Sequence, residues 1–318
     1  MTSPHHVALI SAFPQSQILG IGRTGLVVRQ LEGQTAIKYP LRWSTSSEEE
    51  VQGNIESIQH EQAIYQRLEH CAGIVPFFPV SSTATSTTLR LMETGDLRSY
   101  LSQKTNNPNP PRSRQLSWFR TMAHALSQIH DRRVIVGDIA TRNFLLDAEF
   151  TVWMCDFTES VLLPLDTDMQ RAEWAGYSIH TDIGQLGAVL YEVVTGEKCD
   201  FAIFADLPAE SSSSSGSGIW PRREDLPGTE GIWLGSVIER CWTRGVESAF
   251  ALWVELEAEA LEVEVEVEDE NSLGKRRSLS RDLGLDLNSS LGLLRLGTVC
   301  LATVAVGAIA GYVWSRRR

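Results

Sequence analysis

The feature of this sequence that most constrains its fold is a set of three polar residues in the middle of the chain. Asp138 lies five positions before Asn143, and Asp156 lies thirteen positions after it. Enzymes that transfer phosphoryl groups need such a set: one carboxylate faces the acceptor hydroxyl, while an amide and a second carboxylate hold Mg²⁺ against the phosphates. Short strands predicted over 144–146 and 152–154 place Asn143 and Asp156 on one side of a cleft. These residue types are also common in turns, so the interpretation depends on the rest of the chain.

A glycine-rich segment near the start of the chain has the pattern of a β-hairpin. Residues 18–39 contain two apolar runs separated by a short polar turn. Glycines in such a segment let the backbone come close to phosphate oxygens. Because a strand rather than a helix follows the glycines, the segment does not have the pattern of a dinucleotide-binding turn. Lys38 lies on the second strand, and we expect it to contact phosphates; the alternative is an exposed strand lysine.

Taken in order, these segments resemble the protein kinase superfamily over roughly residues 16–253. The resemblance implies an α+β, bilobal fold with a small β-rich N-lobe over about 16–92 and a helical C-lobe over about 93–253. Residues 1–15 form a short segment ahead of it. The elements that carry the resemblance are the glycine loop, Lys38, Asp138 with Asn143, Asp156, and a helix near Asp182.

The resemblance implies ATP and Mg²⁺ as cofactors and a protein as the substrate. Asp138 would be the catalytic base and Lys38 would hold the phosphates. Glu61, on a helix predicted over 55–69, would orient Lys38; the alternative is that Glu61 is a solvated helix glutamate like Glu56.

The remaining expected contacts are to the metal and to the nucleotide. Asn143 and Asp156 would bind Mg²⁺. Glu93 lies in the expected hinge, where adenine would bond backbone groups near Met92–Thr94. The residues expected to contact ATP are Gly20, Gly22, Gly25, Val27, Ala36, Lys38 and Glu93.

Several positions depart from the kinase pattern. Val136 and Gly137 replace the His-Arg that usually precedes the aspartate, so we expect activity to depend little on phosphorylation of the activation segment. Thr158 replaces the glycine after Asp-Phe, and Gly184 replaces a tryptophan. An Ala-Pro-Glu motif is missing, with residues 172–173 as its nearest remnant, which weakens the expected platform for a peptide substrate.

Three functional hypotheses follow from the resemblance and its departures. The first is an active, divergent protein kinase, which retains all the charged catalytic positions. The second is a pseudokinase that acts as a nucleotide- or protein-binding scaffold, and the third is a phosphotransferase acting on a small molecule.

A net charge of −12 argues against nucleic acid as the main partner. Scattered cysteines without a Cys-x-x-Cys pair indicate reduced thiols rather than disulfides or a zinc site. They are Cys71, Cys155, Cys199, Cys241 and Cys300.

The C-terminal part of the sequence predicts a membrane anchor. Residues 254–290 are interpreted as an acidic and polar linker, either a solvated helix or an extended tether. Residues 296–314 carry no charge and, as a helix, would reach roughly 28 Å, close to the thickness of a bilayer core. Residues 291–318 are therefore predicted to form a single-pass anchor with a basic tail. The kinase-like domain would face the cytosol from the mitochondrial outer membrane or the endoplasmic reticulum.

Overall fold

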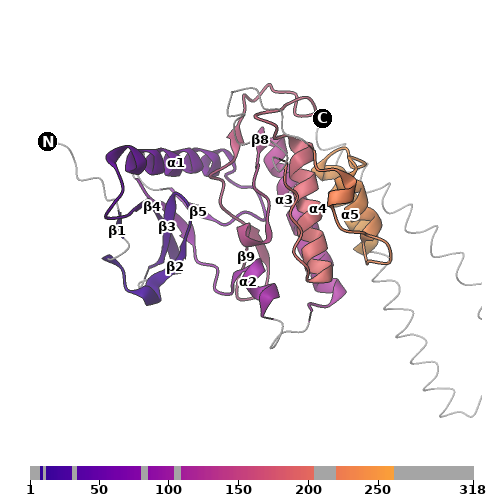
Figure 1. Cartoon of the computed structure of the whole chain (residues 1–318), viewed down its shortest axis with the longest axis horizontal. Coiled ribbons are helices and arrows are strands. Elements are labelled where there is room, and N and C mark those ends of the chain that lie inside the picture. Colours follow the sequence, from indigo (N-terminus) through magenta and orange to yellow (C-terminus); the bar gives the residue numbers. More distant parts are fainter. Residues whose placement is uncertain are drawn as a thin grey trace, which may run out of the picture.

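The structure is a computed structural model that describes residues 8–9, 12–30, 34–79, 85–103, 109–203 and 220–260. Its elements fall into two parts, an N-terminal part built around a sheet and a C-terminal part built from helices (Figure 1). The predicted order, with a sheet-rich part followed by helices, is confirmed and fits a bilobal kinase fold.

The N-terminal part is a six-stranded sheet with one long helix beside it. The strand order is β2-β3-β4-β6-β5, and β1 pairs in parallel with β4. In β4 the side chains of Ala36 and Lys38 share one buried face, as period-two alternation requires. The strands are β1 (Ala8–Leu9), β2 (Ile18–Ile21), β3 (Gly25–Arg29), β4 (Thr35–Arg42), β5 (Phe77–Phe78) and β6 (Thr87–Arg90).

The helix beside the sheet is α1 (Glu48–Arg67), which contacts β4 and lies along the sheet in Figure 1. It starts earlier than the predicted residue 55 because Ser47 and Glu50 form a capping box, each side chain accepting from the backbone N–H of the other. The acidic first turn is also favoured by the helix dipole. The apolar face of α1 is buried and includes Ile58 and Ile64.

The C-terminal part is organised around α3 and α4, whose apolar faces lie in one continuous core. The predicted short strands at 144–146 and 152–154 are confirmed as β9 and β10, an antiparallel pair extended by β7. The helices are α2 (Leu97–Ser102), α3 (Arg112–Asp131), α4 (Ile179–Thr195) and α5 (Gly235–Trp242), with a further helical stretch over 249–260. The strands are β7 (Gly95–Asp96), β8 (Val134–Ile135), β9 (Phe144–Leu146), β10 (Val152–Met154) and β11 (Val161–Leu162).

An aromatic ring from a later segment fills the space beside Gly184, the position where the resemblance leads us to expect tryptophan. A Cβ atom on Gly184 would come within 2.3 Å of Phe201 Cζ, so the phenyl ring lies directly against the helix backbone. Phe201 is buried and meets Trp220 edge to face, with ring centroids 5.0 Å apart. The space beside Gly184 is therefore filled by an aromatic ring from another part of the sequence.

The predicted boundary between domain and linker after residue 253 is wrong. The helical stretch over 249–260 passes through it, and both Leu256 and Ala260 are buried in the C-terminal core. Glu257, part of the acidic run, pairs with Arg120 of α3. The spacing of these apolar residues by four matches a helix face, which is why this stretch packs instead of extending.

The predicted membrane anchor over 291–318 lies outside the described residues, as does the linker from residue 261 onward. Within the described ranges, no helix combines the length and the apolar character that a membrane crossing requires.

Candidate active site

A cavity of about 1040 Å³ lies between the two parts of the chain. Its N-terminal wall contains the glycine-rich turn between β2 and β3, together with Ala36 and Lys38 of β4. Its C-terminal wall contains Asp138, Asn143 and Asp156. The fold therefore brings together polar residues that are far apart in the sequence.

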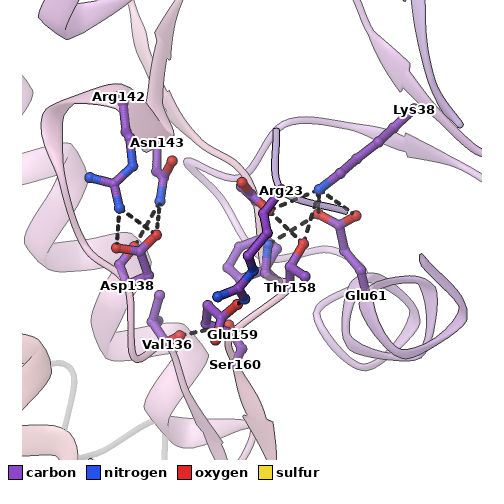
Figure 2. Close-up of polar contacts among 12 residues, drawn as sticks. Arg23, Lys38, Glu61, Val136, Asp138, Arg142, Asn143, Thr158, Glu159 and Ser160 are labelled. Carbon is purple, nitrogen blue, oxygen red and sulfur yellow. Dashed lines mark hydrogen bonds and ion pairs between the residues drawn. The ribbon is translucent and has the colours of Figure 1, made fainter. Parts of the chain in front are cut away.

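Lys38 is the centre of a buried polar network in this cavity. Its Nζ lies 3.1 Å from Glu61 Oε1 and 3.0 Å from Glu61 Oε2, 2.9 Å from Asp156 Oδ1, and 3.0 Å from Thr158 Oγ1 (Figure 2). Burial opposes the charge of the ammonium group, but the carboxylates of Glu61 and Asp156 outweigh it and raise the pKa of Lys38. Lys38 is therefore a cation at neutral pH, placed where a phosphate group can reach it.

Glu61 is the glutamate of α1 that meets Lys38, so it is not the solvated helix glutamate of the alternative interpretation. The Glu61 side chain is fully buried, whereas Glu56 and Glu69 are exposed. Burial raises the pKa of the Glu61 carboxyl. Its Oε1 also accepts a hydrogen bond of 3.1 Å from the backbone N–H of Phe157, which ties α1 to the segment that carries Asp156.

The segment Asp156-Phe157-Thr158 is held by packing on one side and by polar contacts on the other. Phe157 is fully buried and meets the ring of Tyr65 edge to face at 5.1 Å. Asp156 adopts a left-handed backbone conformation with φ of 62°. Burial opposes ionisation of Asp156, but the Lys38 ammonium and the Thr158 hydroxyl lower its pKa below 3.8, so it is a carboxylate at neutral pH.

Asp138 lies on the opposite side of the cavity, held by its own loop. Arg142 Nη2 donates to both carboxylate oxygens of Asp138, at 2.5 and 2.7 Å, and Asn143 Nδ2 donates to Oδ2 at 3.0 Å (Figure 2). A short 3-10 turn over Thr141–Asn143 brings these side chains back toward Asp138. Arg142 was not among the predicted site residues, although its place in the loop was a signal for it.

Asp182 holds the backbone of the loop that carries Asp138. Its carboxylate accepts from the backbone N–H groups of Val136 and Gly137, each at 2.8 Å, and lies 2.9 Å from His130 Nε2. Gly137 has φ of 79°, and a Cβ atom there would come within 3.0 Å of Glu159 O. Glycine at position 137 thus suits a backbone that larger residues would strain.

Of the expected hinge residues Met92–Thr94, Met92 lines the cavity and Glu93 does not. Glu93 is exposed and does not line the cavity; it sits in a turn closed by a bond from Gly95 N to Met92 O of 3.3 Å. Leu89, Arg90, Leu91 and Met92 line the cavity instead.

The residues that could hold a cation are an amide and a carboxylate. Asn143 uses its Nδ2 to bond Asp138, which leaves its Oδ1 available, and the carboxylate of Asp156 is partly exposed. The described residues contain no cluster of three or more His, Cys, Asp or Glu side chains suited to a metal. Two protein oxygens nevertheless fit Mg²⁺, which takes few protein ligands and completes its shell with water and substrate phosphates.

The segment after Asp156 is held against the catalytic loop by neutral hydrogen bonds. β11 pairs with β8, and Ser160, which is buried, donates from Oγ to Val136 O at 2.9 Å. His60 Nε2 of α1 lies 2.7 Å from Ser160 O. These contacts hold the start of the activation segment beside the loop that carries Asp138.

Comparisons with known proteins agree with this geometry. The family model described as the protein kinase domain matches residues 13–202, more than half of the chain. Serine/threonine-protein kinase Nek1 of Mus musculus is 31% identical over 93 residues, which are 25% of this chain and 8% of that protein. Tyrosine-protein kinase JAK3 of Rattus norvegicus is 26% identical over 189 residues, which are 53% of this chain and 16% of that protein. The chain thus spans only a small fraction of the length of these two relatives.

Proposed function

Because this chain belongs to the protein kinase domain family, we propose that it transfers the γ-phosphate of ATP to a hydroxyl group of a protein. One observation carries the proposal: Lys38 Nζ contacts Glu61 and Asp156 together, in the same cavity that Asp138 lines. This is the arrangement that phosphoryl transfer requires, because a cation and a metal-binding carboxylate must meet at the phosphates.

Each residue is proposed to act through the group that it presents to the cavity. Lys38 would bond phosphate oxygens, and Glu61 would keep Lys38 extended toward them. The backbone of the glycine-rich turn would approach the phosphates, since it lines the same cavity. The adenine would bond the backbone at Arg90–Met92 rather than near Glu93.

Mg²⁺ would be held by Asn143 and Asp156 and would neutralise charge on the phosphates. Asp138 would accept the proton of the attacking hydroxyl, and Arg142 would fix the orientation of its carboxylate. The two relatives carry the names of a serine/threonine kinase and a tyrosine kinase, so the acceptor is proposed here only as a protein hydroxyl.

The proposal is tested by phosphate incorporation from γ-labelled ATP with Mg²⁺, into the purified chain itself and into mixed protein substrates. Asp138→Asn is expected to reduce the rate by about 10²–10⁴, the usual contribution of a positioned general base. Asp166→Asn, at an exposed position of the activation segment, is the matched control and should leave the rate unchanged.

The alternative is a pseudokinase, favoured by the replacement of His-Arg with Val136-Gly137 and by the missing Ala-Pro-Glu. Equal background incorporation by the unaltered chain and by Asp138→Asn, with nucleotide still bound, would establish that alternative. Phosphate appearing only on added small alcohols would instead support the small-molecule phosphotransferase.

We also propose that residues 291–318 anchor the protein in a membrane, with the mitochondrial outer membrane or the endoplasmic reticulum as the site. This proposal rests on the uncharged run over 296–314 between basic residues. A chain that lacks 291–318 should move from the membrane fraction of a cell lysate to the supernatant. A shortened chain that stays with the membranes would contradict the proposal.

A further inference from the structure

Thr158 stands where the kinase pattern has glycine, and its hydroxyl takes part in the buried network. Thr158 Oγ1 accepts a hydrogen bond of 3.0 Å from Lys38 Nζ and donates one of 2.7 Å to Asp156 Oδ1 (Figure 2). A hydroxyl has one donor and two acceptor positions, so it suits a place between an ammonium and a carboxylate. Glycine at this position would supply neither bond.

Both side-chain contacts to Asp156 fall on the same oxygen. Lys38 Nζ lies 2.9 Å from Oδ1 and the Thr158 hydroxyl donates to Oδ1 as well. Because the side chains of Lys38 and Thr158 both bond Oδ1, we take Oδ2 as the oxygen for a cation. The side chain of Asp156 is 44% exposed, compared with 1% for Glu61, so Asp156 is the acidic partner of Lys38 that a cation can approach.

We propose that Thr158 is a positioning residue for the metal: its hydroxyl holds Oδ1 of Asp156 so that Oδ2 faces the Mg²⁺ that accompanies the nucleotide. The inference rests on the proposed nucleotide site, but it does not require phosphate transfer. Groups that orient a metal ligand typically change metal affinity by about 10–100-fold when they are removed. The glycine of the kinase pattern has no side-chain group that could orient Asp156 in this way.

The test measures binding of ADP to the full chain as Mg²⁺ is titrated, starting from a solution with EDTA. Thr158→Val removes the hydroxyl and keeps the branched shape, so the Mg²⁺ concentration at half-effect should rise about tenfold. Affinity for ADP in EDTA should change by less than about twofold, because Lys38 keeps its contacts with Glu61 and Asp156. Thr158→Ser retains the hydroxyl and should restore the Mg²⁺ response.

Two further variants keep the test decisive. Thr158→Ala carries the same expectation through a smaller side chain, so the comparison stands if the valine variant does not fold. Thr167→Val, in the same segment, is the matched control and should behave like the unaltered chain.

A Mg²⁺ response of Thr158→Val and Thr158→Ala equal to that of the unaltered chain overturns the inference. An unaltered chain whose affinity for ADP does not depend on the Mg²⁺ concentration also overturns the inference. A chain that binds Mg²⁺ and ADP as expected but transfers no phosphate contradicts the proposed activity and leaves the role of Thr158 supported.

Discussion

Replacing Glu61 by glutamine should destabilise this protein more than any other single loss of charge on α1. The change removes a negative charge beside Lys38, whose side chain is only 10% exposed. Glutamine keeps the shape of the side chain and an oxygen that can still accept from Phe157 N. The perturbation is therefore almost purely electrostatic, and it leaves a buried ammonium with Asp156 as its one remaining carboxylate among the described residues.

The structure sets the size of the effect. Removing one partner of a buried ion pair costs about 3–5 kcal/mol. Asp156 Oδ1 remains 2.9 Å from Lys38 Nζ and still compensates part of the charge. We therefore expect the free energy of unfolding to fall by about 3 kcal/mol, at the lower end of that range. For a domain of this size such a loss lowers the unfolding temperature by about 6–12 °C.

The assay is thermal unfolding of the full chain without nucleotide, followed by circular dichroism. Glu56→Gln is the matched control, because Glu56 is exposed on the same helix and only accepts from Gln52 at 3.0 Å; it should change stability by less than about 0.5 kcal/mol. The double variant Lys38→Met with Glu61→Gln removes both charges and should be at least as stable as either single variant. Equal unfolding temperatures for Glu61→Gln and Glu56→Gln would refute the reasoning.

Three further predictions follow from other contacts. Because the pKa of Asp156 is lowered from 3.8 in the folded chain, its carboxylate stabilises the fold above that value, and this contribution is lost as pH falls through the lower folded pKa. The unfolding temperatures of the unaltered chain and of Asp156→Asn should therefore converge below about pH 4, and a constant difference down to acid unfolding would contradict this. Gly187→Ala should destabilise the fold by about 1–2 kcal/mol in urea unfolding, since a Cβ there would come within 2.7 Å of Cys241 Cβ; unchanged stability would show that α4 and α5 separate easily. Burial raises the pKa of Cys199 and of Cys241 to about 12 each, so iodoacetamide should label both only after unfolding, as mass spectrometry of the digested protein would show; labelling of the native protein would contradict their burial.

Local patterns were sufficient to predict the elements that carry the site. The alternation of β4 turns Lys38 to the cavity, and the periodicity of α1 places Glu61 on its buried face. The β9–β10 hairpin likewise follows from a short-range pattern of apolar runs and a turn. In each case the neighbours that decide the structure are close in sequence.

The features that sequence reasoning missed depend on partners far along the chain. The part of the expected hinge that lines the cavity could not be predicted, because it depends on β6 ending at Arg90, which pairs with Thr35 of β4. The charge of the acidic run after residue 254 predicts a linker, whereas the pairing of Glu257 with Arg120 of α3 depends on the fold. The bonds of Thr158 depend on Lys38, which lies 120 positions away.

The ring of Phe201 against Gly184 has a consequence for how this fold changes over time. The two positions share one volume, so an aromatic ring at one requires a small residue at the other. A change at either position alone leaves a cavity or a clash, whereas a paired exchange preserves the core. Descendants of a common ancestor can therefore differ sharply at a signature position and still have the same interior. At position 184 the packing therefore requires a filled space, and it does not require one particular residue.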